Sequence, residues 1–138
     1  METAAFLKHT ALFSDLTEKE ITTVLGTAKE RHFAVGDVII KEGPGGAGFY
    51  LVLDGSVEVR KGDLVLATFG PGDYFGEMAL LLEDTPRTAD VVATAATSCL
   101  VITRWDLKAL LNAHPEIGVK MMGELAKRLR DTDQALSE

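Results

Sequence analysis

The sequence FGEMALLLEDTPRTADVVA, residues 75–93, combines a helix start, a carboxylate and an arginine, and the rest of the chain is organised around it. Gly76 precedes an apolar run, Met78 to Leu82, that is long enough for about one and a half turns of helix. The first backbone N–H groups of a helix have no partner within the helix and carry the positive end of its dipole. The stretch therefore predicts a short helix whose N-terminus binds an anion.

Three side chains extend this predicted anion site. Arg87 presents a planar fork of donors that suits a phosphate group, and the hydroxyl group of Thr88 adds one more donor. Gly76 has no Cβ, so an anion can approach the backbone closely there. Glu77 can accept hydrogen bonds from a sugar hydroxyl group beside the anion. The combination suits a phosphorylated sugar as the ligand.

The same residues also allow a purely structural interpretation. Glu77 can cap the helix while Arg87 pairs with Glu83 or Asp84 on the surface, and spacing alone favours this simpler alternative. However, F-G-E-M-A-L followed by a short turn and P-R-T-A resembles the phosphate-binding cassette of cyclic nucleotide-binding domains. The resemblance extends over nearly the whole chain, and it shifts the balance towards a ligand site.

The resemblance implies a role for each position of the cassette. In that family the glutamate binds the ribose 2′-hydroxyl group, while amides of the short helix and the arginine bind the cyclic phosphate. The residue after the arginine adds a contact. The implied ligand is a cyclic nucleotide, and no other cofactor is implied. Our leading hypothesis is cAMP in preference to cGMP, with cGMP left open because a threonine at the position of Thr88 favours cGMP in some relatives. The matching positions are Gly76, Glu77, Met78, Ala79, Arg87 and Thr88.

Most of the chain between residues 29 and 103 has the pattern of short strands separated by glycine, proline or aspartate turns. Many short strands at close spacing indicate a sandwich, barrel or jelly roll. We therefore expect a mainly β fold with flanking helices, a β-roll or jelly-roll barrel of about eight short antiparallel strands. The strand segments are Arg31–Ala34, Val38–Lys41, Phe49–Leu53, Val57–Arg60, Leu64–Phe69, Thr88–Thr94 and Ser98–Thr103.

The chain has 138 residues, of which 46% are hydrophobic, and this predicts one domain with a single core. We expect an N-terminal helical segment at 1–28, the β-roll with its cassette at 29–103, and C-terminal helices at 104–138. Thr17 and Glu20 have the spacing of a capping box, which predicts a helix from about Glu18 to Lys29. Two more helices are expected at 104–112 and at 115–136.

The last expected helix carries a seam of side chains three and four residues apart. This seam either packs on the barrel or, as the resemblance implies, forms a lid over the base or a homodimer interface. RLRDTD, residues 128–133, resembles the part of this helix that contacts the base in the family, so Thr132 and Asp133 are candidate base contacts. The seam consists of Met122, Leu125, Leu129, Thr132 and Leu136.

Charge and hydropathy exclude several classes of partner. The net charge is −7, and basic residues are scattered except at Lys127, Arg128 and Arg130, which argues against a general nucleic-acid surface. No winged helix-turn-helix fits after the last helix, so we expect no direct DNA binding by this chain. No signal peptide or apolar run of membrane-spanning length is present, which predicts a cytoplasmic protein without a membrane span.

The sequence offers no evident catalytic or metal site. His9, His32 and His114 fall in separate segments without ligand spacing, so the metal set of a cupin-like enzyme is missing. Cys99 lies in a predicted strand and is expected to be a buried structural thiol. We therefore expect a receptor or regulatory domain that is not an enzyme.

Two functions remain after these exclusions. The first is a cyclic nucleotide receptor domain in which binding moves the C-terminal helix and so reports to a partner. The alternative is a ligand-silent module of the same fold that dimerises or docks. The expected partners are the cyclic nucleotide and either a second copy, bound through the C-terminal helix, or an unidentified effector protein.

Overall fold

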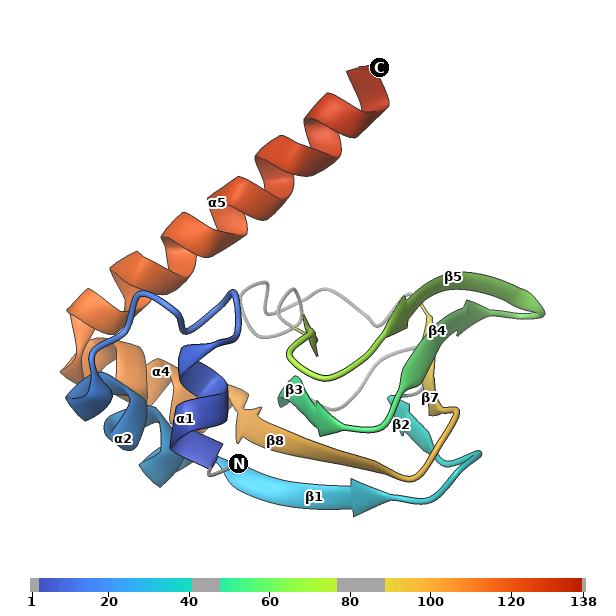
Figure 1. Cartoon of the computed structure of the whole chain (residues 1–138), viewed down its shortest axis with the longest axis horizontal. Helices are drawn as coiled ribbons and strands as arrows, with labels where there is room; N and C mark the ends of the chain where they lie inside the picture. The colour runs from blue at the N-terminus through green and yellow to red at the C-terminus, as the bar shows by residue number, and fades with distance from the viewer. Residues whose placement is uncertain (1–2, 41–47, 77–88, 138) are drawn as a thin grey trace. The chain divides into compact units, whose positions relative to one another are not determined.

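The computed structural model describes residues 3–40, 48–76 and 89–137, with side chains up to Gln134. The chain divides into two compact units, whose helices and strands are labelled in Figure 1. The helical unit consists of Met1–Gly26 and Lys108–Glu138, and the β unit consists of Thr27–Leu107. Each unit buries its own set of apolar side chains.

The β unit contains two antiparallel sheets of four strands each within the described residues. Their strand orders are β1-β8-β3-β6 and β2-β7-β4-β5. The predicted class, mainly β with flanking helices, is confirmed. The strands are β1 (Lys29–Phe33), β2 (Val38–Ile40), β3 (Gly48–Asp54), β4 (Val57–Lys61), β5 (Leu64–Phe69), β6 (Tyr74–Phe75), β7 (Asp90–Ala93) and β8 (Thr97–Thr103).

Two predictions about these elements need correction. The expected helix Glu18–Lys29 ends at Thr27, because the chain from Lys29 onward is extended and pairs with β8. Tyr74 and Phe75 were not expected to form a strand, yet they pair with Leu51 and Tyr50 of β3 as strand β6. Two residues are too few to show the period-two pattern by which a strand is predicted.

Two turns that cross between the sheets pack against each other. Gly55 and Ser56 connect β3 of one sheet to β4 of the other, and residues 94–96 connect β7 back to β8. The buried hydroxyl group of Thr97 lies 2.8 Å from the Ala95 carbonyl oxygen and 3.1 Å from the Ser56 carbonyl oxygen, and its one proton can be donated to either. The N–H of Thr94 donates to the Ser56 carbonyl oxygen at 2.9 Å, and the Ser56 N–H donates to Thr97 Oγ1 at 3.2 Å. These bonds tie the two sheets together at this end.

The core of the β unit lies between the inner faces of the two sheets. Cys99 is fully buried there, as predicted, and burial raises the pKa of its thiol to about 11. A thiol with so high a pKa is almost entirely protonated near neutral pH, so it is a poor nucleophile. The buried cluster consists of Ile40, Val52, Val57, Phe75, Val91, Cys99 and Val101.

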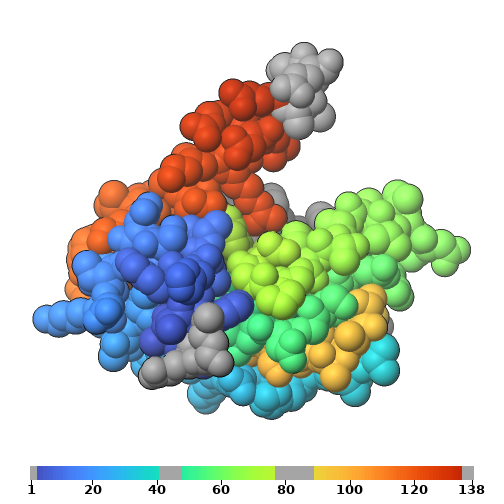
Figure 2. All heavy atoms as spheres, viewed as in Figure 1, coloured from blue at the N-terminus to red at the C-terminus, as the bar shows by residue number. Residues whose placement is uncertain are grey.

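The β4–β5 hairpin projects from the β unit, as its green atoms show in Figure 2. β5 is an edge strand, since it pairs only with β4 in its sheet. Its residues Leu64, Val65 and Leu66 are exposed. They were predicted to form a strand from their strand propensity and from the spacing of the turns, and neither signal indicates whether a strand is buried. The hairpin contributes Val57, which is fully buried in the cluster, together with Val59 and Phe69, which pack against it.

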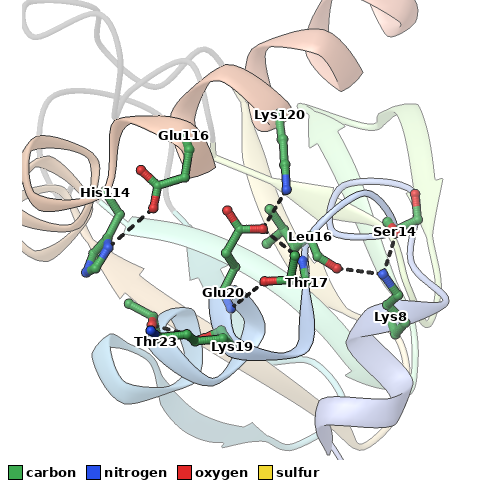
Figure 3. Close-up of polar contacts among 10 residues, drawn as sticks. All are labelled: Lys8, Ser14, Leu16, Thr17, Lys19, Glu20, Thr23, His114, Glu116 and Lys120. Carbon is green, nitrogen blue, oxygen red and sulfur yellow. Dashed lines mark hydrogen bonds and ion pairs between the residues drawn. The ribbon is translucent and has the colours of Figure 1, made fainter.

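The helical unit consists of short N-terminal helices and a long C-terminal one. The predicted capping box is present: the Thr17 N–H donates to Glu20 Oε1 at 2.8 Å, and the Glu20 N–H donates to Thr17 Oγ1 at 3.1 Å. Lys8 closes the preceding loop by donating to the carbonyl oxygens of Ser14 and Leu16, at 3.0 and 2.6 Å (Figure 3). The helices are α1 (Thr3–Lys8), α2 (Glu18–Thr27), α4 (Arg104–Ala113), whose first four residues belong to the β unit, and α5 (Pro115–Ser137).

An ion pair joins α2 to α5 within this unit. Lys120 Nζ donates to Glu20 Oε1 at 2.6 Å, and the Glu20 side chain is only 12% exposed (Figure 3). The hydrogen bond from Lys120, followed by that from the Thr17 N–H, lowers the pKa of Glu20. One carboxylate therefore serves both the N-terminal cap of α2 and the attachment of α5.

Replacing Lys120 with methionine should make stability depend less on pH. Because the pKa of Glu20 is lowered by folding, the pair stabilises the protein above the unfolded pKa of about 4.3 and loses its effect as pH falls through the folded pKa. Urea unfolding should show Lys120→Met less stable than the parent at pH 7, with a smaller difference between them at pH 3. Lys127→Met, at an exposed lysine of the same helix, is the control. An equal deficit at both pH values would contradict the assignment.

Candidate ligand site

The structure describes the start of the cassette, up to Gly76, and its end, from Ala89 onward. Strand β6 holds the two residues before Gly76: Phe75 is buried and stacks on Tyr50, with ring centroids 5.0 Å apart and the rings nearly parallel. Phe69 also stacks on Phe75, with ring centroids 6.1 Å apart and the rings nearly parallel. The ring contacts of Phe75 therefore hold the residue that directly precedes Gly76.

Gly76 itself has a φ of +90°, a backbone conformation that side chains with a Cβ rarely adopt. The sequence indicates a glycine that admits an anion to the backbone, and the structure adds a conformational reason for glycine at the same position. A residue with a side chain would be strained there whether or not a ligand is bound.

The other end of the cassette is held by the second sheet. After Ala89, which is buried, β7 pairs with β2 on one side and with β4 on the other, so it is an inner strand. Val91 and Val92 are buried as well, and Val91 belongs to the core cluster. The segment between Gly76 and Ala89 thus connects the edge of one sheet to the interior of the other.

The remaining cassette positions, 77–88, lie outside the described residues. Their predicted roles, with Glu77 at the ribose, Met78 and Ala79 among the helix amides, and Arg87 and Thr88 at the phosphate, stay predictions.

Thr132 and Asp133, the candidate base contacts, lie on α5 in the helical unit, and both are exposed. The Thr132 hydroxyl group donates to the Arg128 carbonyl oxygen at 3.0 Å, a bond made within the helix itself. A base contact in which this hydroxyl group donates would compete with that local bond, whereas one in which it accepts would not. Their role at the base stays a prediction.

Two of the three histidines form local polar contacts. His32 Nδ1 lies 2.9 Å from Ser98 Oγ and its Nε2 lies 3.1 Å from Glu30 Oε2, on the exposed side of β1 and β8. His114 Nδ1 lies 3.5 Å from Glu116 Oε1. Over residues 3–40, 48–76 and 89–137, histidine, cysteine and acidic side chains form no group of three or more suited to a metal ion.

Comparison with known proteins decides the family. The model of the family described as "Cyclic nucleotide-binding domain" matches residues 30–114, a range that includes the whole cassette sequence. The chain belongs to the cyclic nucleotide-binding domain family. The resemblance noted in the sequence is thereby confirmed, and the two-sheet β unit is the fold of this family.

Related proteins contain this domain as one part of a longer chain. A cGMP-dependent protein kinase from Plasmodium berghei is 40% identical over 90 residues, which are 65% of this chain and 10% of the kinase. A cAMP-dependent protein kinase regulatory subunit from Hypocrea atroviridis is 41% identical over 90 residues, 65% of this chain and 19% of the subunit. The matched part of this chain therefore covers less than a fifth of the length of either relative.

The solved structure of the Thermus thermophilus catabolite activator protein is similar over a longer range. It superposes with a TM-score of 0.80 and 34% sequence identity, covering 93% of this chain and 62% of that one. The chain is thus similar both to proteins of kinase systems and to a catabolite activator protein. Among the helices of the described residues, none combines the length and the apolar character that crossing a bilayer needs.

Proposed function

We propose that this chain is a cyclic nucleotide receptor domain that prefers cAMP to cGMP and has no catalytic activity of its own. The observation that carries the proposal is the family match over residues 30–114, which spans an intact cassette sequence with Gly76, Glu77 and Arg87 in place. The positive φ of Gly76 supports it, since this conformation suits a glycine-initiated cradle for phosphate.

Each part of the nucleotide has a proposed partner. The cyclic phosphate accepts hydrogen bonds from amides at Gly76, Met78 and Ala79 and from the guanidinium group of Arg87, and Thr88 adds a donor. Glu77 accepts a hydrogen bond from the ribose 2′-hydroxyl group. Thr132 and Asp133 of α5 contact the base. No metal or further cofactor takes part in this scheme.

The preference for cAMP over cGMP is the most specific part of the proposal. The relatives named above include one kinase regulated by cGMP and one subunit named for cAMP, at nearly equal identity to this chain. Thr88 can donate to either nucleotide. The choice of cAMP is supported by 34% identity, over 94% of this chain, to a Thermus thermophilus protein named "Cyclic AMP receptor protein".

Binding would be reported by α5. A ligand can shift a conformational equilibrium only by its difference in affinity for the two states, so contacts from α5 to the base would favour an ordered helix. The effector is a cytoplasmic partner protein or a second copy of this chain. We treat residues 1–138 as one such regulatory domain, with helical segments at both ends of its β-roll.

A ligand-silent dimerisation module is the second candidate, and the exposed seam of α5 favours it. Met122 and Leu129 are 60% and 63% exposed, and they occupy the seam predicted from the sequence. A side chain of this kind gains about 1.5–3 kcal/mol when it is fully buried, so two copies could pair through this seam.

Saturable binding of cAMP or cGMP to the purified chain tests the receptor proposal. Sedimentation with and without nucleotide separates it from the alternative. A receptor should bind and change its hydrodynamic behaviour, whereas a dimer that neither binds nucleotide nor responds to it would support the silent module.

A further inference from the structure

The two described sheets of the β unit have four edge strands, and three of these carry a feature that opposes pairing with another chain. Strand β1 presents the charged side chains of Lys29, Glu30 and Arg31, all of them exposed. Strand β6 has only two residues, and β2 has three residues with an irregular register between Val38 and Ile40. The remaining edge strand is β5.

Strand β5 lacks these protections. It has six residues, LVLATF, and none of them is charged or proline. The side chains of Leu64, Val65 and Leu66 are 63%, 47% and 53% exposed. The register of the hairpin shifts between Val59 and Arg60 of β4, opposite residue 66 of β5. The unprotected part of the edge is therefore the end of β5 next to the turn.

The geometry of that turn decides which backbone groups face the open edge. Strands β4 and β5 are joined by a two-residue loop, and Gly62, its first residue, has a φ of +61°, as a tight hairpin turn needs. Lys61 and Leu64 flank the loop and are paired, so they exchange backbone hydrogen bonds with each other. Because the direction of these groups alternates along a strand, the N–H and C=O of Val65 face away from β4.

The sequence around Val65 is self-complementary. When two β5 strands pair antiparallel about a two-fold axis at Val65, this residue lies opposite its own counterpart, and Leu64 lies opposite Leu66 of the second copy. The two Val65 residues can then exchange both backbone hydrogen bonds.

Charge also favours contact between copies at this place. The chain has a net charge of −7, so two copies repel each other overall. The hairpin, residues 57–69, has no net charge, because its two acidic residues balance its two basic ones. These four residues are Glu58, Asp63, Arg60 and Lys61.

We propose that two copies of this chain associate through β5, which pairs antiparallel with β5 of the second copy about a two-fold axis at Val65. The pairing joins the two sheets that contain β5 into one continuous sheet. Few side chains take part, so the interface is smaller than that of a stable dimer, and the dissociation constant is on the order of 0.1 mM. This surface is separate from the α5 seam considered above.

Sedimentation velocity of the full chain without nucleotide, from about 10 μM to about 1 mM, tests the interface. The sedimentation coefficient of the parent should rise over this range. Val65→Lys and Val65→Glu should each weaken association about tenfold, because like charges then lie directly opposite each other. Since position 65 meets itself, an equimolar mixture of the two variants should associate more strongly than either variant alone.

The two variants also exclude melting of the hairpin as the cause. Arg60 lies opposite Val65 within the hairpin, so Val65→Glu gains an internal partner of opposite charge and Val65→Lys does not. Damage to the hairpin would therefore weaken association in the lysine variant more than in the glutamate variant. The proposed pairing predicts a similar loss in both.

Val38→Lys and Val38→Glu are the matched controls, since Val38 is a valine that is 54% exposed on the edge strand β2. Alone or mixed, they should associate as the parent does. A parent that stays monomeric up to about 1 mM, Val65 variants that associate as strongly as the parent, or a mixture no stronger than its components would overturn the proposal. Because no nucleotide is present, none of these outcomes bears on whether the chain binds one.

Discussion

Replacing Arg87 with alanine should weaken cyclic nucleotide binding by about 30-fold to several thousandfold. Removing one member of a buried, hydrogen-bonded charge pair costs roughly 2–5 kcal/mol, and the cyclic phosphate would be left without its cationic partner. Calorimetric titration of the variant with cAMP and with cGMP measures the loss. The proposed contact is to the phosphate that both nucleotides share, so affinity for both should fall by similar factors.

Arg31→Ala provides the control for the loss of one positive charge. Arg31 lies on β1, outside the cassette, and is exposed. Its replacement should leave the affinity within about twofold of the parent, because exposed charges at a distance are screened by salt. An Arg87→Ala variant that bound nucleotide as tightly as the parent would show that the cassette assignment is wrong.

The largest effect on stability is expected for Gly55→Ala. Gly55 has a φ of +94°, and an added Cβ would lie 2.4 Å from the Ala96 carbonyl oxygen and 2.7 Å from Thr97 Cα. Both neighbours are backbone atoms, one at the end of the second crossing turn and one in the first residue of β8, so relief requires the two backbone segments to separate. The strained backbone and the overpacking together should cost roughly 2–5 kcal/mol of unfolding free energy, measured by urea denaturation.

Gly62→Ala separates the two causes. Gly62 also has a positive φ, of +61°, but an added Cβ would meet nothing within 4 Å, so only the conformational cost of about 1–2 kcal/mol applies. The difference between the variants reports the contact between the turns. If both variants lost the same unfolding free energy, the close contact with Ala96 and Thr97 would add nothing to the cost of a side chain at position 55.

Local sequence signals were sufficient for most of the fold. Every predicted strand except Ser98–Thr103 has a glycine, proline or aspartate within two residues of at least one end, and the capping box at Thr17 and Glu20 marks the start of α2. The end of that helix was predicted two residues too late because Lys29 suits a helix by its intrinsic propensity. Its strand conformation is decided by pairing with Val101, far along the chain.

Contacts between distant segments were beyond the reach of sequence patterns. Nothing near Ser56 indicates that Thr97 will bond to it, and nothing near Glu20 indicates Lys120, because these partners meet only in the folded chain. The same applies to the aromatic stack that anchors β6. The candidate site could be predicted from the sequence because Gly76, Glu77 and Arg87 lie close together in one continuous motif.

Calorimetric titration of cAMP and cGMP into protein that has been unfolded and refolded tests the receptor proposal most directly. Refolding removes any nucleotide retained from the expression host. The account predicts saturable binding with a dissociation constant in the micromolar range or tighter, with cAMP favoured. Absence of heat from either nucleotide at two temperatures, with a native circular dichroism spectrum, would contradict it and leave the ligand-silent module as the better description.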